Sequence, residues 1–324
     1  MMQLLFAILA LISGIVLIIY SSMKAVKHSA ILAAALGVSP LVIGVSLVSI
    51  GTDISEIFNS LISCALGHAD IDIGDSVGSD LTQLTLIFGL LPLVAGVFYI
   101  HRKDIIILGA CEILSLVLIF TVVEKGYITR FNGIILVGCL GIYIWLIYNA
   151  NKESILQRVE MIEKIKAPKS KKFHLLIAVI GFGGVTLAAF LIVESVIFIS
   201  SLLNIHEYII SFFIVAVGTS LPELVVDINA LKLGHHQIAI GDIVGSCIVD
   251  STLSIGIGQV VFNRNPNYIT AALAVPTVLY TLFASFIVFI TIAARKKIDK
   301  KAGIMFITLY FISYIFLFTF WIRI

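Results

Sequence analysis

The sequence is poor in charged residues, and this shortage excludes most classes of protein at once. Asp, Glu, Lys and Arg make up only 12% of the 324 residues, whereas 60% are hydrophobic and the mean hydropathy is +1.13. So few charged side chains cannot cover the surface of a soluble globule. The formal net charge of +2 says little by itself, and no nucleic-acid partner is expected. We therefore predict an integral membrane protein whose principal partner is the lipid bilayer.

Cysteine is also scarce. The four cysteines, Cys64, Cys111, Cys139 and Cys247, lie within or beside apolar runs and have neither CxxC nor metal-type spacing. Cysteines in such surroundings are usually small core residues. They give no indication of compartment, and we expect no cofactor.

The apolar runs have the length of membrane-spanning helices. A hydrocarbon core about 30 Å thick needs about 20 residues of helix, and by that measure the chain is all-α with ten transmembrane helices. The second run is too long for one straight crossing, and Gly37 and Pro40 are places where it could bend. The predicted spans cover residues 4–22, 31–66, 74–99, 105–123, 132–150, 174–200, 208–231, 240–260, 269–293 and 303–322.

The basic residues are unevenly distributed among the loops. Of the 21 Lys and Arg residues, 17 fall in one set of alternate loops, seven of them in the polar linker between Asn151 and Lys172. Under the positive-inside rule this set faces the cytoplasm. We therefore expect a multi-pass protein of the cell membrane with a cytoplasmic linker and both termini on the opposite side.

Two stretches of the chain repeat one another. Gly51 to Gly89 aligns without a gap on Gly218 to Gly256 at an offset of 167 residues, and the shared letters are mostly polar. Five spans precede the linker and five follow it, so the two copies enter the membrane in opposite directions. We predict a first five-helix repeat (1–150), a linker (151–173) and a second repeat (174–324). Inverted repeats of this kind are typical of secondary transporters. The sequence does not give the oligomeric state, and we expect a monomer to be sufficient.

The repeat carries acidic residues inside apolar spans. Glu56 aligns with Glu223, and a carboxylate at the centre of a membrane costs about 2.5–3.5 kcal/mol on insertion scales. Neither has a Lys or Arg in its own span, so its partners are cations, protons or polar residues of the repeat. The surrounding oxygen donors suit hard cations such as Ca²⁺ and Na⁺. These predicted site residues are Thr52, Asp53, Ser79 and Gln83 in the first copy and Thr219, Ser220, Ser246 and Asp250 in the second.

The second copy contains two motifs, GTSLPE (Gly218 to Glu223) and GDIVGSCIVD (Gly241 to Asp250). They are similar to GTSLPE and GNxxGSNxxD, the motifs of the sodium/calcium exchanger family of the cation/calcium antiporter superfamily, so the chain resembles that family. The resemblance implies two inverted five-helix halves, no cofactor, and Ca²⁺ and Na⁺ as the transported ions. It implies that Glu56 and Glu223 are shared Ca²⁺ ligands together with the carbonyls of Thr52 and Thr219. It assigns flanking Na⁺ or proton sites to Ser79, Ser220, Ser246 and Asp250.

The chain also departs from the family pattern. Asp53, Ile54 and Ser55 stand where the family has Ser, Leu and Pro, and Gln83 stands where Asn or Asp is usual. Asp53 could strengthen divalent binding or couple transport to protons. Four positions commonly given to Asn are changed to Asp75, Asp80, Asp242 and Cys247. We interpret Asp75 and Asp242, which each follow a Gly at the beginning of a span, as helix caps.

Three other functions compete with Na⁺/Ca²⁺ exchange by alternating access. A H⁺-coupled exchanger of Ca²⁺ or another divalent cation would keep the same fold. An intramembrane aspartyl enzyme would use Asp75 and Asp242, but positions 72 and 239 do not complete the GxGD pattern of such enzymes. A channel needs no inverted repeat. We therefore expect an antiporter, not an enzyme.

Overall fold

The computed structural model describes residues 2–35, 52–100, 102–150, 171–232, 236–262 and 266–321. Gly37, Pro40 and most of the predicted linker lie outside the described residues. Within these ranges, nine helical stretches are long and apolar enough to cross a membrane, and Ile54–Leu66 forms a shorter apolar helix, α4. The predicted fold class, an all-α membrane protein, is confirmed.

Most predicted spans lie within a few residues of the observed helices. The first helix is an exception, because it continues to Ala35 and includes residues 31–35, which we assigned to the second span. The first half contains α1 (Met2–Ala35), α4, α5 (Ala69–Leu81), the π-helical segment η2 (Thr82–Ile87), α6 (Phe88–Val94), α7 (Arg102–Val123) and α8 (Arg130–Ala150). The second half contains α10 (Lys171–Leu203), α11 (Glu207–Ile210), η3 (Ser211–Val215), α12 (Ala216–Thr219), α13 (Leu221–Lys232), α14 (His236–Val249), η4 (Asp250–Ser254), α15 (Ile255–Val261), α16 (Ala271–Arg295) and α17 (Lys300–Trp321).

The predicted position of the third span is wrong by about five residues. We expected it over residues 74–99, but the continuous helix of α5, η2 and α6 begins at Ala69 and ends at Val94. The first turn of this helix carries Asp70 and Asp72. Asp72 is in fact fully buried, and the Asp70 carboxylate is hydrogen-bonded. At the other end, Gly96 has φ +85° and turns the chain toward a short strand.

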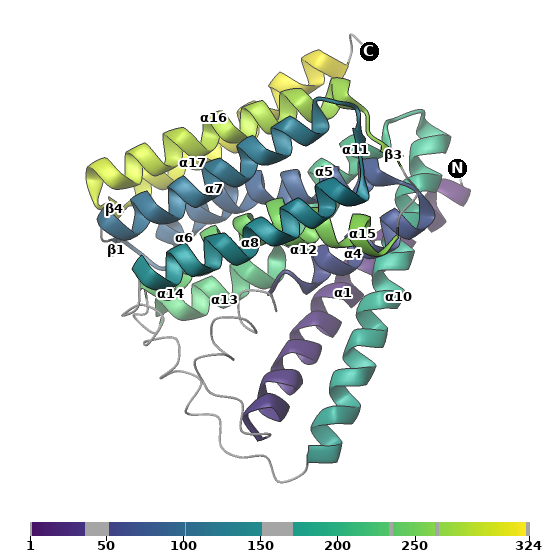
Figure 1. Ribbon diagram of the computed structural model, residues 1–324, viewed down its shortest axis with the longest axis horizontal. Coiled ribbons are helices and arrows are strands. Elements are labelled where there is room, and N and C mark those ends of the chain that lie inside the picture. Colours follow the sequence, from purple (N-terminus) through teal and green to yellow (C-terminus); the bar gives the residue numbers. More distant parts are fainter. Residues whose placement is uncertain are drawn as a thin grey trace.

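Two short strand pairs tie loops of the two halves together. Strand β1 (Phe98–Tyr99) pairs antiparallel with β4 (Lys297–Ile298), and β2 (Tyr127–Ile128) pairs antiparallel with β3 (Asn267–Tyr268). Figure 1 shows β1 and β4 at one end of the long helices and β3 toward the other. Each pair joins two loops that the count of basic residues assigns to the same side.

The last helix of each half packs against the other half. A Cβ atom at Gly303 of α17 would lie 2.5 Å from the carbonyl oxygen of Gly89 in α6. The matching contact joins α8 to α15, where a Cβ atom at Gly133 would lie 2.7 Å from the carbonyl oxygen of Gly256. Gly89 and Gly256 are equivalent positions of the repeat. Such small residues let membrane helices approach closely, so both contacts depend on the absence of side chains.

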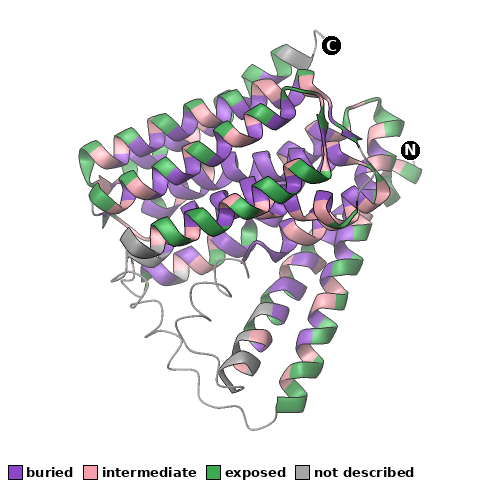
Figure 2. Ribbon diagram, in the orientation of Figure 1, coloured by how far each residue is buried: buried purple, intermediate pink, exposed green. Residues whose placement is uncertain are grey.

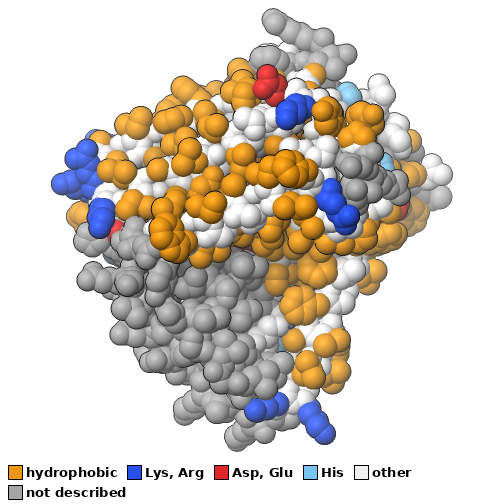
Figure 3. All heavy atoms as spheres, in the orientation of Figure 1, with side chains coloured by type: hydrophobic (Ala, Val, Ile, Leu, Met, Phe, Trp, Pro, Cys, Tyr) orange, Lys and Arg blue, Asp and Glu red, His pale blue; other side chains and the backbone are white. Residues whose placement is uncertain are grey.

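The surface is apolar and the polar residues lie inside. Figure 2 shows buried residues gathered on the inner helices and exposed ones along the outer faces of α7, α16 and α17. Large exposed side chains include Phe131 on α8, Phe283 and Ile290 on α16, and Phe311 on α17. Figure 3 shows a broad hydrophobic face with basic side chains toward its margins. A face of this kind is suited to lipid rather than to water.

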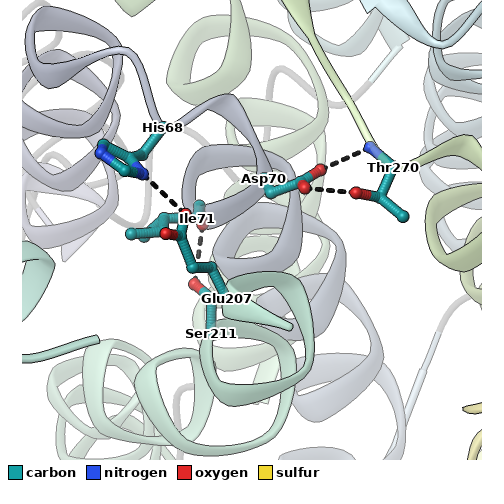
Figure 4. Close-up of polar contacts among 6 residues, drawn as sticks. All are labelled: His68, Asp70, Ile71, Glu207, Ser211 and Thr270. Atoms are coloured by element: carbon teal, nitrogen blue, oxygen red, sulfur yellow. Dashed lines mark hydrogen bonds and ion pairs between the residues drawn. The ribbon is translucent and has the colours of Figure 1, made fainter. Parts of the chain in front are cut away.

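The hairpin of α4 and α5 is fastened to the second half at its tip. His68 Nδ1 lies 2.7 Å from Glu207 Oε2, and the Asp70 carboxylate accepts hydrogen bonds from the backbone N–H and the hydroxyl of Thr270 at 2.7 and 2.5 Å. Figure 4 shows the side chains of His68 and Asp70 pointing to separate partners. The tip is therefore held to both α11 and the loop that precedes α16. A third contact in the same view joins Ser211 Oγ to the carbonyl oxygen of Ile71 at 2.7 Å.

Candidate cation-binding site

The centre of the protein is formed by two helix breaks at equivalent positions. In the second half α12 ends at Thr219 and α13 begins at Leu221, with Ser220 between them at φ −82° and ψ 3°. In the first half Asp53, at φ −80° and ψ 11°, immediately precedes α4. Pro222 has no N–H and cannot donate the helical bond to residue 218. The first copy lacks this proline, so the break at Asp53 does not require one.

Three carboxylates meet at these breaks. Ligand atoms of Asp53, Glu56 and Glu223 all lie within 4.8 Å of one another, and the three side chains are buried. Ser55 Oγ donates a hydrogen bond to Glu56 Oε2 at 2.7 Å. Among the described residues, Glu56 Oε1 and both carboxylate oxygens of Glu223 have no hydrogen-bond partner. Carboxylates buried in this way need a compensating charge, and the arrangement is suited to a cation.

Hydroxyl groups flank the carboxylates in two equivalent contacts. Thr52 Oγ1 lies 3.4 Å from Ser246 Oγ, and Thr219 Oγ1 lies 3.3 Å from Ser79 Oγ. In each contact the Thr precedes the break of one half and the Ser belongs to the long helix of the other half. The carbonyl oxygen of Thr219 also accepts a hydrogen bond from Ser55 Oγ at 3.3 Å. Each half therefore completes the oxygen lining of the other.

Gln83 and Asp250 lie four residues after Ser79 and Ser246, in the same two helical stretches. Gln83 Nε2 donates a hydrogen bond to Asp250 Oδ2 at 3.2 Å, and both residues belong to π-helical segments. The wider turn of a π-helix displaces side chains from their usual register and often marks a functional site. Ser220 is oriented differently, because its hydroxyl donates to the carbonyl oxygen of Ala216 at 2.8 Å. The structure thus brings all ten predicted site residues into the interior, in the contacts given above.

Our interpretation of Asp75 and Asp242 as helix caps is wrong. The helices begin at Ala69 and His236, so both residues lie in helix interiors, where they are fully buried. The Asp75 carboxylate accepts hydrogen bonds from Asn59 Nδ2 at 2.6 Å and from Thr219 Oγ1 at 3.0 Å. Asp75 therefore contacts a predicted site residue directly. Its spacing of four residues from Ser79, which puts both on one helix face, was the signal that could have identified it.

Comparison with known proteins identifies the family to which the chain belongs. The family model described as "Sodium/calcium exchanger protein" matches residues 6–149 and 173–319. The chain belongs to the sodium/calcium exchanger family. An uncharacterized membrane protein of Methanocaldococcus jannaschii is 30% identical to it over 93% of this chain and 94% of its own length. The sodium/calcium exchanger MaX1 of Methanosarcina acetivorans is 26% identical over 93% of this chain and 95% of its own length.

A solved structure has the same fold as this exchanger. The sodium-calcium exchanger NCX_Mj, soaked with Na⁺ and Ca²⁺, superposes with a TM-score of 0.60 at 26% identity, covering 95% of this chain and 97% of its own. The predicted class of function, cation/calcium antiport in a multi-pass membrane protein, is confirmed. The driving ion and the roles of individual residues stay predictions.

Proposed function

We propose that the protein exchanges Na⁺ for Ca²⁺ at the Asp53, Glu56 and Glu223 carboxylates by alternating access. The observation that supports this most is the meeting of Glu56 and Glu223 from two inverted halves, with three of their four carboxylate oxygens lacking hydrogen-bond partners among the described residues. Carboxylate and hydroxyl oxygens are the ligands that Ca²⁺ and Na⁺ prefer. The carbonyl and hydroxyl groups of Thr52 and Thr219, with Ser79, Ser246 and Asp250, complete the proposed ligand set.

Competition for shared ligands couples the two ions. Three carboxylates carry up to three negative charges, and these repel one another in a medium of low dielectric constant. A Ca²⁺ ion cancels two of the charges, and Na⁺ ions can cancel the same charges one at a time. Both kinds of ion therefore cannot occupy the site fully together, so the binding of one favours release of the other.

The two halves provide the means of access from either side. The contacts of Thr52 with Ser246 and of Thr219 with Ser79 are nearly equivalent in length, and each joins one half to the other. A movement that opens one contact toward one side of the membrane has a counterpart that opens the other contact toward the opposite side. The ions stay at the centre while one contact opens and the other closes.

Proton coupling is the alternative that a specific observation favours. Asp53 stands where the family has Ser, and it adds a third carboxylate to the pair. After Ca²⁺ has cancelled two charges, the remaining one can be balanced by H⁺ instead of Na⁺. The fold and the Ca²⁺ ligands would be unchanged.

Ca²⁺ uptake by proteoliposomes separates the two forms of coupling. Vesicles loaded with Na⁺ and diluted into Na⁺-free buffer should accumulate Ca²⁺, whereas vesicles loaded with choline should not. A pH gradient without Na⁺ should give no uptake. If a pH gradient drives uptake and Na⁺ is without effect, the H⁺ alternative replaces our proposal.

We also propose that residues 1–150 and 174–324 are the two inverted repeats, with the linker cytoplasmic and both termini outside. The grouping of basic residues supports this orientation. Cysteines introduced at Lys297 and at Tyr127, one in each strand pair, should differ in their reaction with an impermeant maleimide in intact cells. Only the cysteine at 127 should be labelled, and labelling at 297 alone would reverse the orientation.

A further inference from the structure

A second cluster of ligand groups lies outside the carboxylates that form the proposed transport site. Ligand atoms of Asp80 in α5, Glu112 in α7 and Cys247 in α14 all lie within 4.8 Å of one another, and all three residues are buried. The cluster shares no residue with Asp53, Glu56 and Glu223. It also recruits α7, which lies outside the repeated motif.

Two carboxylate oxygens of this cluster lack partners. Asp80 Oδ2 accepts a hydrogen bond from Ser251, and Glu112 Oε2 accepts one from Ser115 Oγ at 3.3 Å. Among the described residues, however, Asp80 Oδ1 and Glu112 Oε1 are buried without a hydrogen-bond partner. The ion pairs found in the described part of the chain are at its loops, with His68, Arg295 and Lys297 as the cations. None of them compensates Asp80 or Glu112.

Two departures from the family motif meet in this cluster. Asp80 and Cys247 are equivalent positions of the repeat, and the motif has Asn at both. Two Asn side chains would be neutral and could hydrogen-bond to one another. In this chain the same positions instead supply a carboxylate and a thiol, and Glu112 adds a second carboxylate. The changes thus replace a neutral amide pair by three groups that can each ligate a metal.

We propose that Asp80, Glu112 and Cys247 form a second cation site, which binds a thiol-seeking divalent metal of the Zn²⁺ and Cd²⁺ class. Ca²⁺ and Mg²⁺ prefer ligand sets made entirely of oxygen, whereas sulfur favours softer metals. Cys247 ligates as the thiolate, and its proton leaves to water when the metal binds. The metal cancels two of the three negative charges, and the hydroxyls of Ser115 and Ser251 hydrogen-bond to the carboxylates.

The second site is connected to the first through side chains. The thiol of Cys247 donates to Gln83 Oε1 at 3.2 Å, and Gln83 Nε2 donates to Asp250 at 3.2 Å. A metal on Cys247 removes the thiol proton from the first of these bonds, so Gln83 must change its partner. Occupancy of the second site therefore alters the surroundings of Asp250, and we expect it to slow exchange.

Cd²⁺ binding to the purified full-length protein tests the site directly. Equilibrium dialysis in detergent should give one Cd²⁺ per chain that excess Ca²⁺ does not displace, together with the ultraviolet absorption band of a Cd²⁺–thiolate bond. The same result is expected in a Glu56→Gln/Glu223→Gln background, which separates this site from the proposed transport site. Loss of this Cd²⁺ in that background would mean that there is no second site.

The variants are chosen so that loss of folding does not imitate loss of binding. Cys247→Asn and Asp80→Asn restore the residue of the family motif, and each should weaken Cd²⁺ binding about tenfold or more. Cys247→Asn should also abolish the thiolate band. Glu112→Gln, which keeps the shape of the side chain, should weaken binding similarly. Cys111→Ser and Cys64→Ser are matched controls, because both thiols lie outside the cluster, and they should leave the band unchanged. A thiolate band that survives Cys247→Asn, or that disappears in either control, would overturn the proposal.

Discussion

Gln83 and Asp250 occupy equivalent positions in the two halves, 167 residues apart, and they are hydrogen-bonded to one another at 3.2 Å. Residues related by an internal two-fold axis can touch only where that axis passes between them. The contact therefore marks the axis, and it lies beside the meeting point of Glu56 and Glu223. A site on the axis is equally distant from the two faces through which ions must pass, as alternating access requires.

Removing either central carboxylate should abolish exchange. We expect Glu56→Gln and Glu223→Gln each to weaken Ca²⁺ binding about tenfold or more, which corresponds to about 1.4 kcal/mol or more, because a neutral amide cannot compensate a divalent charge. Ca²⁺ should also no longer raise the melting temperature of these variants. Glu194→Gln is the control, since Glu194 is exposed on α10. Normal uptake in both central variants would refute the assignment.

Asp53→Ser tests the origin of the coupling. The substitution restores the family residue and removes the third carboxylate from the cluster. We expect Na⁺-driven Ca²⁺ uptake to continue and to vary less with external pH, because one proton-binding group has been removed. Uptake should be measured at several pH values at a fixed Na⁺ gradient. Complete loss of uptake with intact folding would show that exchange also requires the charge of Asp53, and not only the charges of Glu56 and Glu223.

The glycine contacts between α6 and α17 should be intolerant of side chains. A leucine at Gly303 must displace the backbone of Gly89, and overpacking of this kind costs about 1–3 kcal/mol. The melting temperature of Gly303→Leu in detergent should fall accordingly. Gly138→Leu is the matched control, because a Cβ atom at Gly138 would meet no described atom within 4 Å. Equal loss of stability in both variants would show that helix propensity or hydrophobicity is the cause.

The stability of the fold should depend on pH through Asp299, which lies outside the membrane spans. The backbone N–H of Ala302 donates to its carboxylate at 3.0 Å, and this bond, with Arg295 and Lys297, lowers the pKa of Asp299 below its ordinary value of 3.8. A lowered pKa stabilises the folded state above pH 3.8, and the stabilisation is lost as the pH falls through the folded-state pKa. Wild type should therefore melt above Asp299→Asn near neutral pH, and the difference should shrink below pH 3.8. A constant difference across this range would contradict the prediction.

The fold could be predicted from the sequence because two independent signals agreed. The apolar runs predicted the helices. The polar residues shared by the two copies of the repeat predicted the central carboxylates and the residues around them. The errors came from acids that tertiary structure compensates. Asp70 and Asp72 lie before the third span that we predicted, yet they belong to the first turn of its helix. We interpreted Asp75 as a cap because it follows a Gly, and its actual partners, Asn59 and Thr219, are distant in the sequence.

The second cluster could not be predicted from the sequence. Glu112 lies on a helix outside the repeated motif, and nothing along the chain links it to Asp80 or Cys247. In the sequence, Cys247 has the apolar neighbours of an ordinary core cysteine and no metal-type spacing to another cysteine. Only the packing of α7 against the repeat brings these three residues together.

The crossed contacts of α8 and α17 affect how the molecule can come apart. In each five-helix unit, the third helix packs against the fifth helix of the opposite unit. Neither unit therefore has its full helix packing without the other. If the chain is cut between the units, each fragment should recover its full helix packing only by associating with the other fragment in the same bilayer.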